Sequence, residues 1–229
     1  LFAKESTITF MAALPLMFYF FTDAKKEHYF RSISAMAFCT IIFLLIRRKI
    51  LSGVETEIPM IDNYIAGLPN FFLQRVNAIY MLGYYVKTLF VPYPLIADGS
   101  YNHFKAVSAT DWKFLLSAIG LGSALIYSFV RFKQKDKLAF GILFFFITAS
   151  VASNIFLLIG TCYGERLMYI PSLGFCFVIA SLIIKVSKSD LTDRLFNSWS
   201  TFFNSFKIPI AATIVIALIF SLQTYARSM

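Results

Sequence analysis

Six long apolar runs, separated by short clusters of charge, constrain the fold of this chain more than any other feature. They cover approximately residues 6–22, 30–47, 112–131, 138–159, 167–186 and 207–224. A helix needs roughly 20 apolar residues to cross a hydrocarbon core of about 30 Å. Since 59% of the 229 residues are hydrophobic and only 14% are charged, a soluble domain could not hide this surface. We therefore predict an all-α, polytopic membrane helical bundle of about six transmembrane helices.

The charged clusters between these runs predict how the bundle is oriented. The chain has 21 Lys and Arg against 12 Asp and Glu, and the bases lie in short clusters between apolar runs, which is typical of membrane topology and argues against nucleic acid. The basic loops at 131–137 and 185–194 fall on one side, which the positive-inside rule makes cytoplasmic. The turn at 160–166 and the C-terminus then face the extracytoplasmic side.

The segment from Asn70 to Ile96 leaves two topologies open. It is long enough to span, yet it carries Arg75, Lys87 and several tyrosines, so it either crosses or lies in the interface as an amphipathic or re-entrant helix. If it crosses, 13 Lys and Arg are cytoplasmic and seven are outside, with Lys87 in the span. If it does not, 11 are cytoplasmic and ten are outside. The charge count mildly favours the crossing topology.

No internal repeat, linker or familiar catalytic motif divides the chain, which we interpret as one unit over residues 1–229. The sequence contains no Gly-rich phosphate loop, HExxH or nucleophile elbow. Its three cysteines have no close spacing, so we predict neither a disulfide nor a metal site, and no cofactor is certain. A divalent metal stays compatible with the sequence, although no ligand cluster demands one. The chain begins without methionine and ends just after an apolar run, so we expect a piece of a longer protein.

Ionisable side chains beside membrane spans are costly, so those that persist are candidates for function. Lys4 and Glu5 open the first run, where an ordinary snorkelling pair at the interface is the alternative. Arg47, Arg48 and Lys49 end the second run. They are either ordinary positive-inside anchors or, through bidentate guanidinium contacts, a clamp for a lipid phosphate.

Two further candidate groups lie in loops. Asp98 and Asn102 lie in a turn rich in Pro, Gly and Asn, which is usually only a loop. A carboxylate and an amide beside aromatic rings is also a common way to bind sugar hydroxyls. Glu165 and Arg166 fall at the start of the fifth run, where the helix dipole alone would favour a glutamate.

Three stretches together resemble a known family. "LFAKEST" opens one span, "DNYIAGLPN" is followed by "RVNAIYMLGYYVKTLFVPYPLIADGSYN", and "GERLMYIPSLGF" opens another span. In this order they are similar to the C-terminal half of the membrane region of the transmembrane and tetratricopeptide-repeat O-mannosyltransferases and their bacterial relatives. The resemblance covers most of residues 1–186.

The resemblance implies a membrane glycosyltransferase of the multi-spanning GT-C type, with a polyprenyl-phosphate sugar as donor. It implies about eleven spans, an active site on the outer face and tetratricopeptide repeats after the last span. This chain would then be the C-terminal half of a GT-C-like transmembrane domain, truncated at both ends. The catalytic carboxylate base would lie upstream of Leu1, so this piece would be inactive alone. The bacterial inner membrane is the expected location.

The resemblance also carries roles onto single residues. Its Lys-Glu pair falls on Lys4 and Glu5, its loop aspartate on Asp98, and its Glu-Arg before Tyr-x-Pro-Ser on Glu165 and Arg166. We expect the basic side chains to contact the lipid phosphate, in the order Arg166, Arg48, Arg47 and Lys4. Glu5 and Glu165 would support them by orienting these bases or binding sugar hydroxyls, with Tyr169 completing the motif. Asp98 and Asn102 are candidates for the acceptor loop. Because the non-crossing topology gathers all these groups on one face, the resemblance favours it, and we predict it against the charge count: about six transmembrane helices plus one interfacial or re-entrant helix at Asn70 to Ile96.

The predicted function is transfer of a hexose such as mannose from a polyprenyl phosphate to a hydroxyl of a protein or glycan outside the cytoplasm. Basic groups would stabilise the departing phosphate. One alternative is a transporter or flippase of a lipid-linked substrate, which predicts charges at mid-span and broken helices in paired halves. A second alternative is a non-catalytic membrane anchor for an exported repeat domain.

Overall fold

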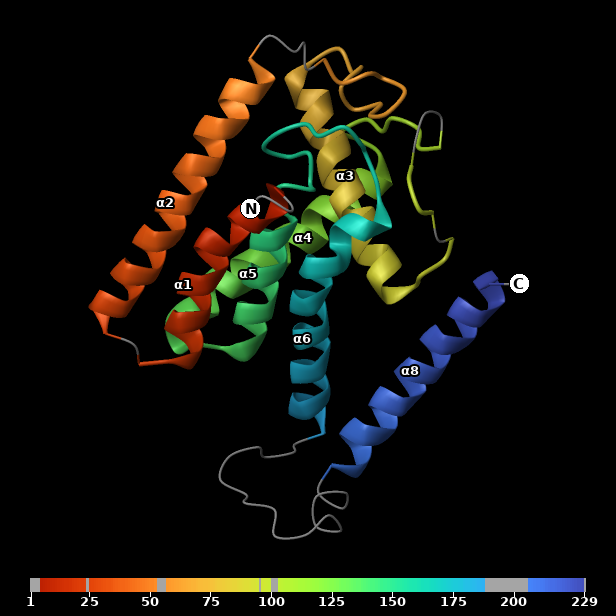
Figure 1. Ribbon diagram of the computed structural model, residues 1–229. Coiled ribbons are helices and arrows are strands. Elements are labelled where there is room, and N and C mark those ends of the chain that lie inside the picture. Colours follow the sequence, from red (N-terminus) through yellow and green to blue (C-terminus); the bar gives the residue numbers. More distant parts are fainter. Residues whose placement is uncertain are drawn as a thin grey trace.

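The computed structural model describes residues 5–23, 25–52, 57–94, 96–99, 103–187 and 206–228, and these residues form helices and loops without a strand. Their α-helices are α1 (Phe10–Phe21), α2 (Lys26–Leu51), α3 (Phe71–Phe90), α4 (Trp112–Arg131), α5 (Lys137–Ala149), α6 (Tyr169–Val186) and α8 (Lys207–Ser228) (Figure 1). Short 3-10 helices precede α1 (η1, Glu5–Thr9), follow α4 (η2, Phe132–Gln134) and precede α6 (η3, Glu165–Met168). The predicted all-α fold is confirmed for the described residues.

Polar side chains set where three of the helices begin. Asn70 caps α3 by accepting from the backbone N of Leu73 at 2.7 Å, and Asp111 caps α4 by accepting from Lys113 N at 2.9 Å. Asp136 caps α5. Each side-chain oxygen satisfies a backbone N–H that the first helical turn leaves without a partner.

Four helical segments are long and apolar enough to cross a bilayer. They are Lys26–Leu51, Trp112–Gln134, Glu165–Val186 and Lys207–Ala226. Most of the side chains on these segments are not buried within the chain, as is suitable for helices that face lipid. Ser6–Phe21 and Lys137–Ala149 are apolar but shorter.

The run predicted over 138–159 is the place where the sequence interpretation was wrong. Helix α5 ends at Ala149, so its 13 residues rise only about 20 Å. Residues 150–164 form a loop, in which Asn154 adopts a left-handed backbone with φ of 57° and its Oδ1 accepts from Ile159 N at 2.9 Å. This local hydrogen bond competes with a continued helix, although the sequence there remains apolar.

Helix α5 lies at the centre and packs against α6, α1 and α4. Its closest approach is to α6, where a Cβ on Gly174 would lie 2.7 Å from the carbonyl oxygen of Gly141. Phe140 and Phe144 extend this core toward α1. A second cluster, around Tyr85 and Tyr163, joins α3 to the loop before α6.

Two long-range contacts bear on whether α3 crosses the membrane. Lys135, in the turn after α4, lies 3.4 Å from Asp23, in the turn after α1. Asn63, before α3, donates to the side chain of Asn154 at 3.0 Å. The crossing topology would separate the members of both pairs by a bilayer, whereas the non-crossing topology keeps each pair on one side. The contacts therefore favour the non-crossing topology over the one that the charge count favoured. In Figure 1, residues 103–111 lead into the start of α4.

Candidate functional site

Two stacked tyrosines form the floor of the candidate site. Tyr85 of α3 and Tyr163 of the loop before α6 lie 4.5 Å apart between ring centroids, with 19° between their planes. The Tyr85 hydroxyl accepts from Gly164 N at 2.7 Å, and the Tyr163 hydroxyl donates to Thr88 at 3.3 Å. Both rings are buried, so this floor fixes the loop before α6 onto α3.

Two chain segments run side by side above this floor. Gly99 N donates to the carbonyl of Tyr163 at 2.9 Å, and the Cys162 thiol donates to the carbonyl of Gly99 at 2.8 Å. Glu165 accepts from the backbone N of Ile96. A Cβ on residue 99 would lie 2.5 Å from the Phe104 ring, so only glycine allows this approach. The result is that residues 96–99 are held against residues 162–165.

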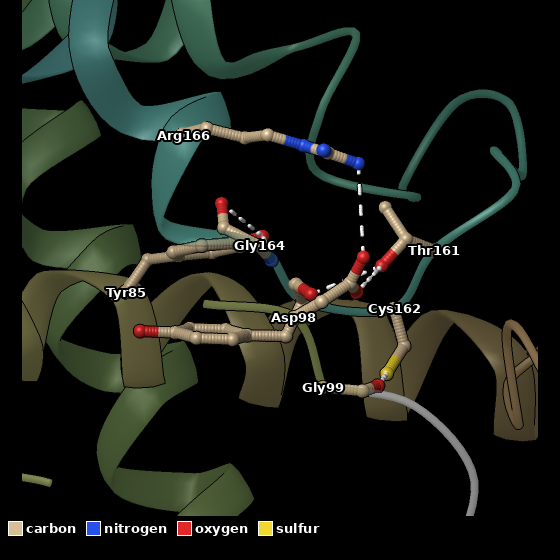
Figure 2. A network of polar contacts seen from close by, with 8 residues as sticks. Tyr85, Asp98, Gly99, Thr161, Cys162, Gly164 and Arg166 are labelled. Atoms are coloured by element: carbon tan, nitrogen blue, oxygen red, sulfur yellow. Dashed lines mark hydrogen bonds and ion pairs between the residues drawn. The ribbon is translucent and has the colours of Figure 1, made fainter. Parts of the chain in front are cut away.

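Asp98, Thr161 and Arg166 form a polar cluster on the outside of this pairing. The Thr161 hydroxyl donates to Asp98 Oδ1 at 2.9 Å, and Arg166 Nη2 lies 3.6 Å from Asp98 Oδ2. Figure 2 shows the Arg166 side chain reaching across toward Asp98 and Thr161 above the tyrosines. The Arg166 side chain is 74% exposed and that of Asp98 is 50% exposed. A guanidinium has five N–H donors, so Arg166 retains the capacity to bind an anionic ligand while it contacts Asp98.

Burial also affects the ionisable groups beneath this cluster. It raises the pKa of the Cys162 thiol to about 11, and the negative charge of Asp98 acts in the same direction. Burial likewise raises the pKa of Tyr163. These groups are therefore neutral at physiological pH, and charge in this part of the site resides on Asp98, Glu165 and Arg166.

A frame of polar side chains supports the loop that carries Thr161 and Arg166. Asn63 donates to the side chain of Asn154 at 3.0 Å and to the carbonyl of Ile159 at 2.8 Å. Arg75 of α3 donates to the carbonyl of Asn154 at 2.7 Å and also to that of Ile155. Sequence reasoning gave these residues no role in the site. The sequence does contain one indication of this frame: Asn63 and Asn154 lie in or beside apolar stretches, and an amide that becomes buried there requires hydrogen-bond partners.

The structure brings some of the predicted site residues together and leaves others apart or outside the described residues. The structure brings Asp98, Glu165 and Arg166 together with Thr161 into one polar network, although Glu165 and Arg166 follow Asp98 by 67 and 68 residues along the chain. Tyr169 begins α6 with its side chain 78% exposed. Lys4 and Asn102 lie outside the described residues, and the side chain of Glu5, at the start of η1, does too.

The basic end of α2 is separate from this network. Arg47 and Arg48 lie in the last turns of α2 and are exposed. Figure 1 shows α2 ending at the end of the molecule where α3 begins. The described residues contain no cluster of three or more His, Cys, Asp or Glu that could hold a metal ion.

The fold and the candidate site describe an integral membrane protein with a polar site at one end of its helices. Comparison with known proteins finds distant relatives that are all named protein O-mannosyl-transferases.

The chain is 28% identical over 160 residues to protein O-mannosyl-transferase F38B6.6 of Caenorhabditis elegans, covering 69% of the chain and 23% of that protein. It is 26% identical over 210 residues to mouse protein O-mannosyl-transferase TMTC1, covering 86% of the chain and 20% of that protein. With human protein O-mannosyl-transferase TMTC4, 27% of 143 residues are identical, over 59% of the chain and 19% of that protein.

These relatives are distant, and the chain spans about a fifth of their length. No family model and no solved structure matches the chain. The chain is thus similar, over most of its own length, to proteins named as protein O-mannosyl-transferases.

Proposed function

We propose that this chain forms part of a GT-C type membrane glycosyltransferase, which transfers a hexose such as mannose from a polyprenyl phosphate to a hydroxyl of a protein or glycan. In this arrangement the chain crosses the membrane six times, and η1–α1 and α5 cross as short helices. The polar network and the C-terminus would face the extracytoplasmic side, and tetratricopeptide repeats would follow the last span. The resemblance to bacterial relatives favours the bacterial inner membrane as the location.

The observation that carries the proposal is the position of Arg166 directly before an apolar helix. Its exposed guanidinium lies directly before α6, which begins at Tyr169 and is apolar enough to span. A helix end of this kind lies near the lipid headgroups, where the phosphate of a lipid-linked sugar would also lie. Asp98, which accepts from the Thr161 hydroxyl, contacts the guanidinium without burying it, so a phosphate has access to its remaining N–H donors.

The reaction would be a displacement at the anomeric carbon of the sugar. The oxygen of the acceptor hydroxyl forms the new bond, and the bond from the anomeric carbon to the phosphate oxygen breaks with its electron pair on the phosphate. Arg166 would stabilise the developing negative charge there. A carboxylate base outside the described residues, as the resemblance implies, would take the hydroxyl proton. Glu165 would position Asp98 and the rest of segment 96–99 through the backbone N of Ile96.

The test is Arg166→Ala in the full-length protein, with labelled mannosyl polyprenyl phosphate as donor and release of the lipid phosphate as the measurement. Removal of one electrostatic contact to the transition state should lower kcat roughly 100-fold or more. Arg166→Lys should retain part of the rate, since it keeps the charge but not the planar fork. Glu5→Gln tests the first candidate group in the same assay.

The matched control is Arg131→Ala, which removes an exposed arginine from the last turn of α4. It should leave the rate within about twofold of wild type, because a surface position away from the site contributes little. A wild-type rate in Arg166→Ala would remove this network from the active site. A wild-type protein that releases no lipid phosphate from any sugar donor would favour the non-catalytic anchor.

A further inference from the structure

The loop between α5 and α6 has an apolar tip that the described part of the chain leaves exposed. Residues 155–159 have the sequence "IFLLI", without a polar side chain. Phe156 and Leu157 are 73% and 75% exposed, whereas Leu158 packs against the chain's own core. Adjacent apolar side chains at this exposure are unfavourable in water, so the tip is suited to an apolar partner.

Side chains from inside the chain satisfy backbone groups of this loop. Asn154 Oδ1 accepts from Ile159 N at 2.9 Å, and Asn63 donates to the Ile159 carbonyl at 2.8 Å. Arg75 donates to the carbonyls of Asn154 and Ile155. Non-helical backbone is tolerated at membrane depth where the protein itself supplies such partners, because hydrocarbon supplies none. The loop therefore has polar support on its inner side and apolar side chains on its exposed side.

The length of α5 places the start of this loop at membrane depth. Helix α5 begins at Lys137, next to the basic turn after α4, and such a turn belongs at the membrane surface. Its 13 residues rise only about 20 Å, so Ala149 lies about 10 Å short of the far side of a hydrocarbon core of about 30 Å. Figure 1 shows the loop alongside α3, below the end of the molecule at which α2 ends and α3 begins. The residues after Ala149 are therefore level with lipid acyl chains.

Helix α3 adds a third apolar side chain next to the tip. Arg75 Cζ lies 4.4 Å from the centre of the Phe71 ring, and the same guanidinium donates to the carbonyl of Ile155. Phe71 is 70% exposed. An arginine that stacks on an aromatic ring while its N–H groups bond carbonyls is suited to the boundary between hydrocarbon and headgroups. The start of α3 and the loop tip thus form one apolar edge.

We propose that the loop after α5 enters the lipid leaflet on the side of the polar network, with Phe156 and Leu157 among the acyl chains and Phe71 beside them. The partner is the hydrocarbon of the bilayer. Acyl chains offer no hydrogen bonds, and this loop has backbone groups bonded from inside, whereas an extended segment that binds a protein often pairs its backbone with that partner. Thr161 and Arg166 follow in the same connection, so the immersed tip would hold the polar network at headgroup level. This anchoring does not depend on which reaction the network performs.

The test is photo-crosslinking from the tip in the full-length protein. A p-benzoylphenylalanine, which inserts into nearby C–H bonds on irradiation, replaces Phe156 in protein held in phosphatidylcholine nanodiscs, and mass spectrometry of the peptides identifies what it has joined. We expect phosphatidylcholine adducts within about twofold of those formed when the same group replaces Ile119, which is 69% exposed on the membrane span at α4. The control position is Lys105, which is exposed in the loop before α4 and should give roughly tenfold fewer adducts, because a charged side chain avoids hydrocarbon.

The identity of the joined atoms decides between the possible surroundings of the tip. Adducts on acyl carbons are expected. Crosslinks from Phe156 to another segment of the protein, or to a second copy, would show that protein covers the tip and would overturn the proposal. Lipid adducts no more frequent than those from Lys105 would place the tip in water, and adducts on the choline group alone would place it at the surface; either result would also refute immersion. The measurement needs no sugar donor, so failure of the transfer assay would leave its outcome unchanged.

Discussion

Replacement of Asn77 tests whether a buried amide holds the loop after α3 in place. Its side chain is 0% exposed, and its Oδ1 accepts from Val107 N at 2.9 Å and from the Tyr64 hydroxyl at 3.2 Å. Its Nδ2 donates to the carbonyls of Val107 and Leu73 at 3.0 and 2.9 Å. The amide thus satisfies both backbone groups of a buried loop residue, as a neighbouring strand would.

Asn77→Leu keeps the size of the side chain and removes all four hydrogen bonds. The Leu73 carbonyl remains within its helix, so three groups are left without their partner: the N–H and C=O of Val107 and the hydroxyl of Tyr64. Each unsatisfied buried group costs about 1 to 3 kcal/mol, so we expect the free energy of unfolding to fall by about 3 to 9 kcal/mol. At about 2 to 4 °C per kcal/mol, the midpoint of thermal unfolding should fall by at least about 6 °C.

The assay is thermal unfolding in detergent, followed by the fraction of protein that remains monodisperse. Ser123→Ala is the control, because this exposed hydroxyl bonds only a carbonyl within its own helix, and its midpoint should stay within about 1 °C of wild type. Asn70→Ala, which removes the exposed cap of α3, should fall between them, with a loss of about 1 kcal/mol. A midpoint for Asn77→Leu no lower than that of Asn70→Ala would refute the reasoning.

Three other perturbations probe the frame and the helix crossing. Arg75→Ala should lower the unfolding midpoint by several degrees, because two carbonyls of the loop after α5 lose a charged donor, and Arg75→Lys should recover part of the loss. Because burial raises the pKa of the Cys162 thiol to about 11 from 9.0, the neutral thiol is favoured in the fold. Stability from this group is therefore complete below pH 9 and lost as the pH rises toward 11, which pH-dependent unfolding of wild type against Cys162→Ser would detect. Gly83→Val should disrupt the crossing with Ser117, where even a Cβ would lie 2.1 Å from the hydroxyl, and should lower the midpoint more than Gly122→Val.

The helices were predictable because long apolar runs leave few alternatives in a bilayer. All six predicted runs contain a helix, and the segment at Asn70–Ile96 contains the α3 helix. The error at residues 150–159 has a definite cause. Hydropathy there favours a continued span, but the turn at Asn154 and the partners supplied by Arg75 and Asn63 stabilise a loop. Those partners are 79 and 91 residues distant, and periodicity contains no information on contacts of that range.

The candidate site was predictable in its charges but not in its frame. Asp98 and Arg166 are conspicuous because ionisable groups beside spans are costly. Asn63, Asn77 and Asn154 are neutral, and an asparagine in a sequence looks the same whether it faces solvent or is buried with its amide fully bonded. Charge counting gives little guidance on the topology for a related reason. The two arrangements differ by only two cytoplasmic bases in 21, whereas single contacts such as Asp23 with Lys135 distinguish them.

The asparagines beneath the candidate site are buried, whereas the charged side chains of Asp98 and Arg166 are exposed, and this difference bears on ligand binding. Asn63 and Asn154 of the frame are buried neutral side chains whose amides are hydrogen-bonded within the chain, so they contribute stability and offer little to a ligand. The ion pair of Arg166 with Asp98 is half exposed or more on both sides and 3.6 Å long, a type that contributes at most about 1 kcal/mol. An anionic phosphate could therefore replace or share the Asp98 contact at little cost to the fold. An arginine that binds phosphate should be held in position before the ligand arrives and should still have free N–H donors. The weak contact of Arg166 with Asp98, on a loop held by buried hydrogen bonds, meets both conditions.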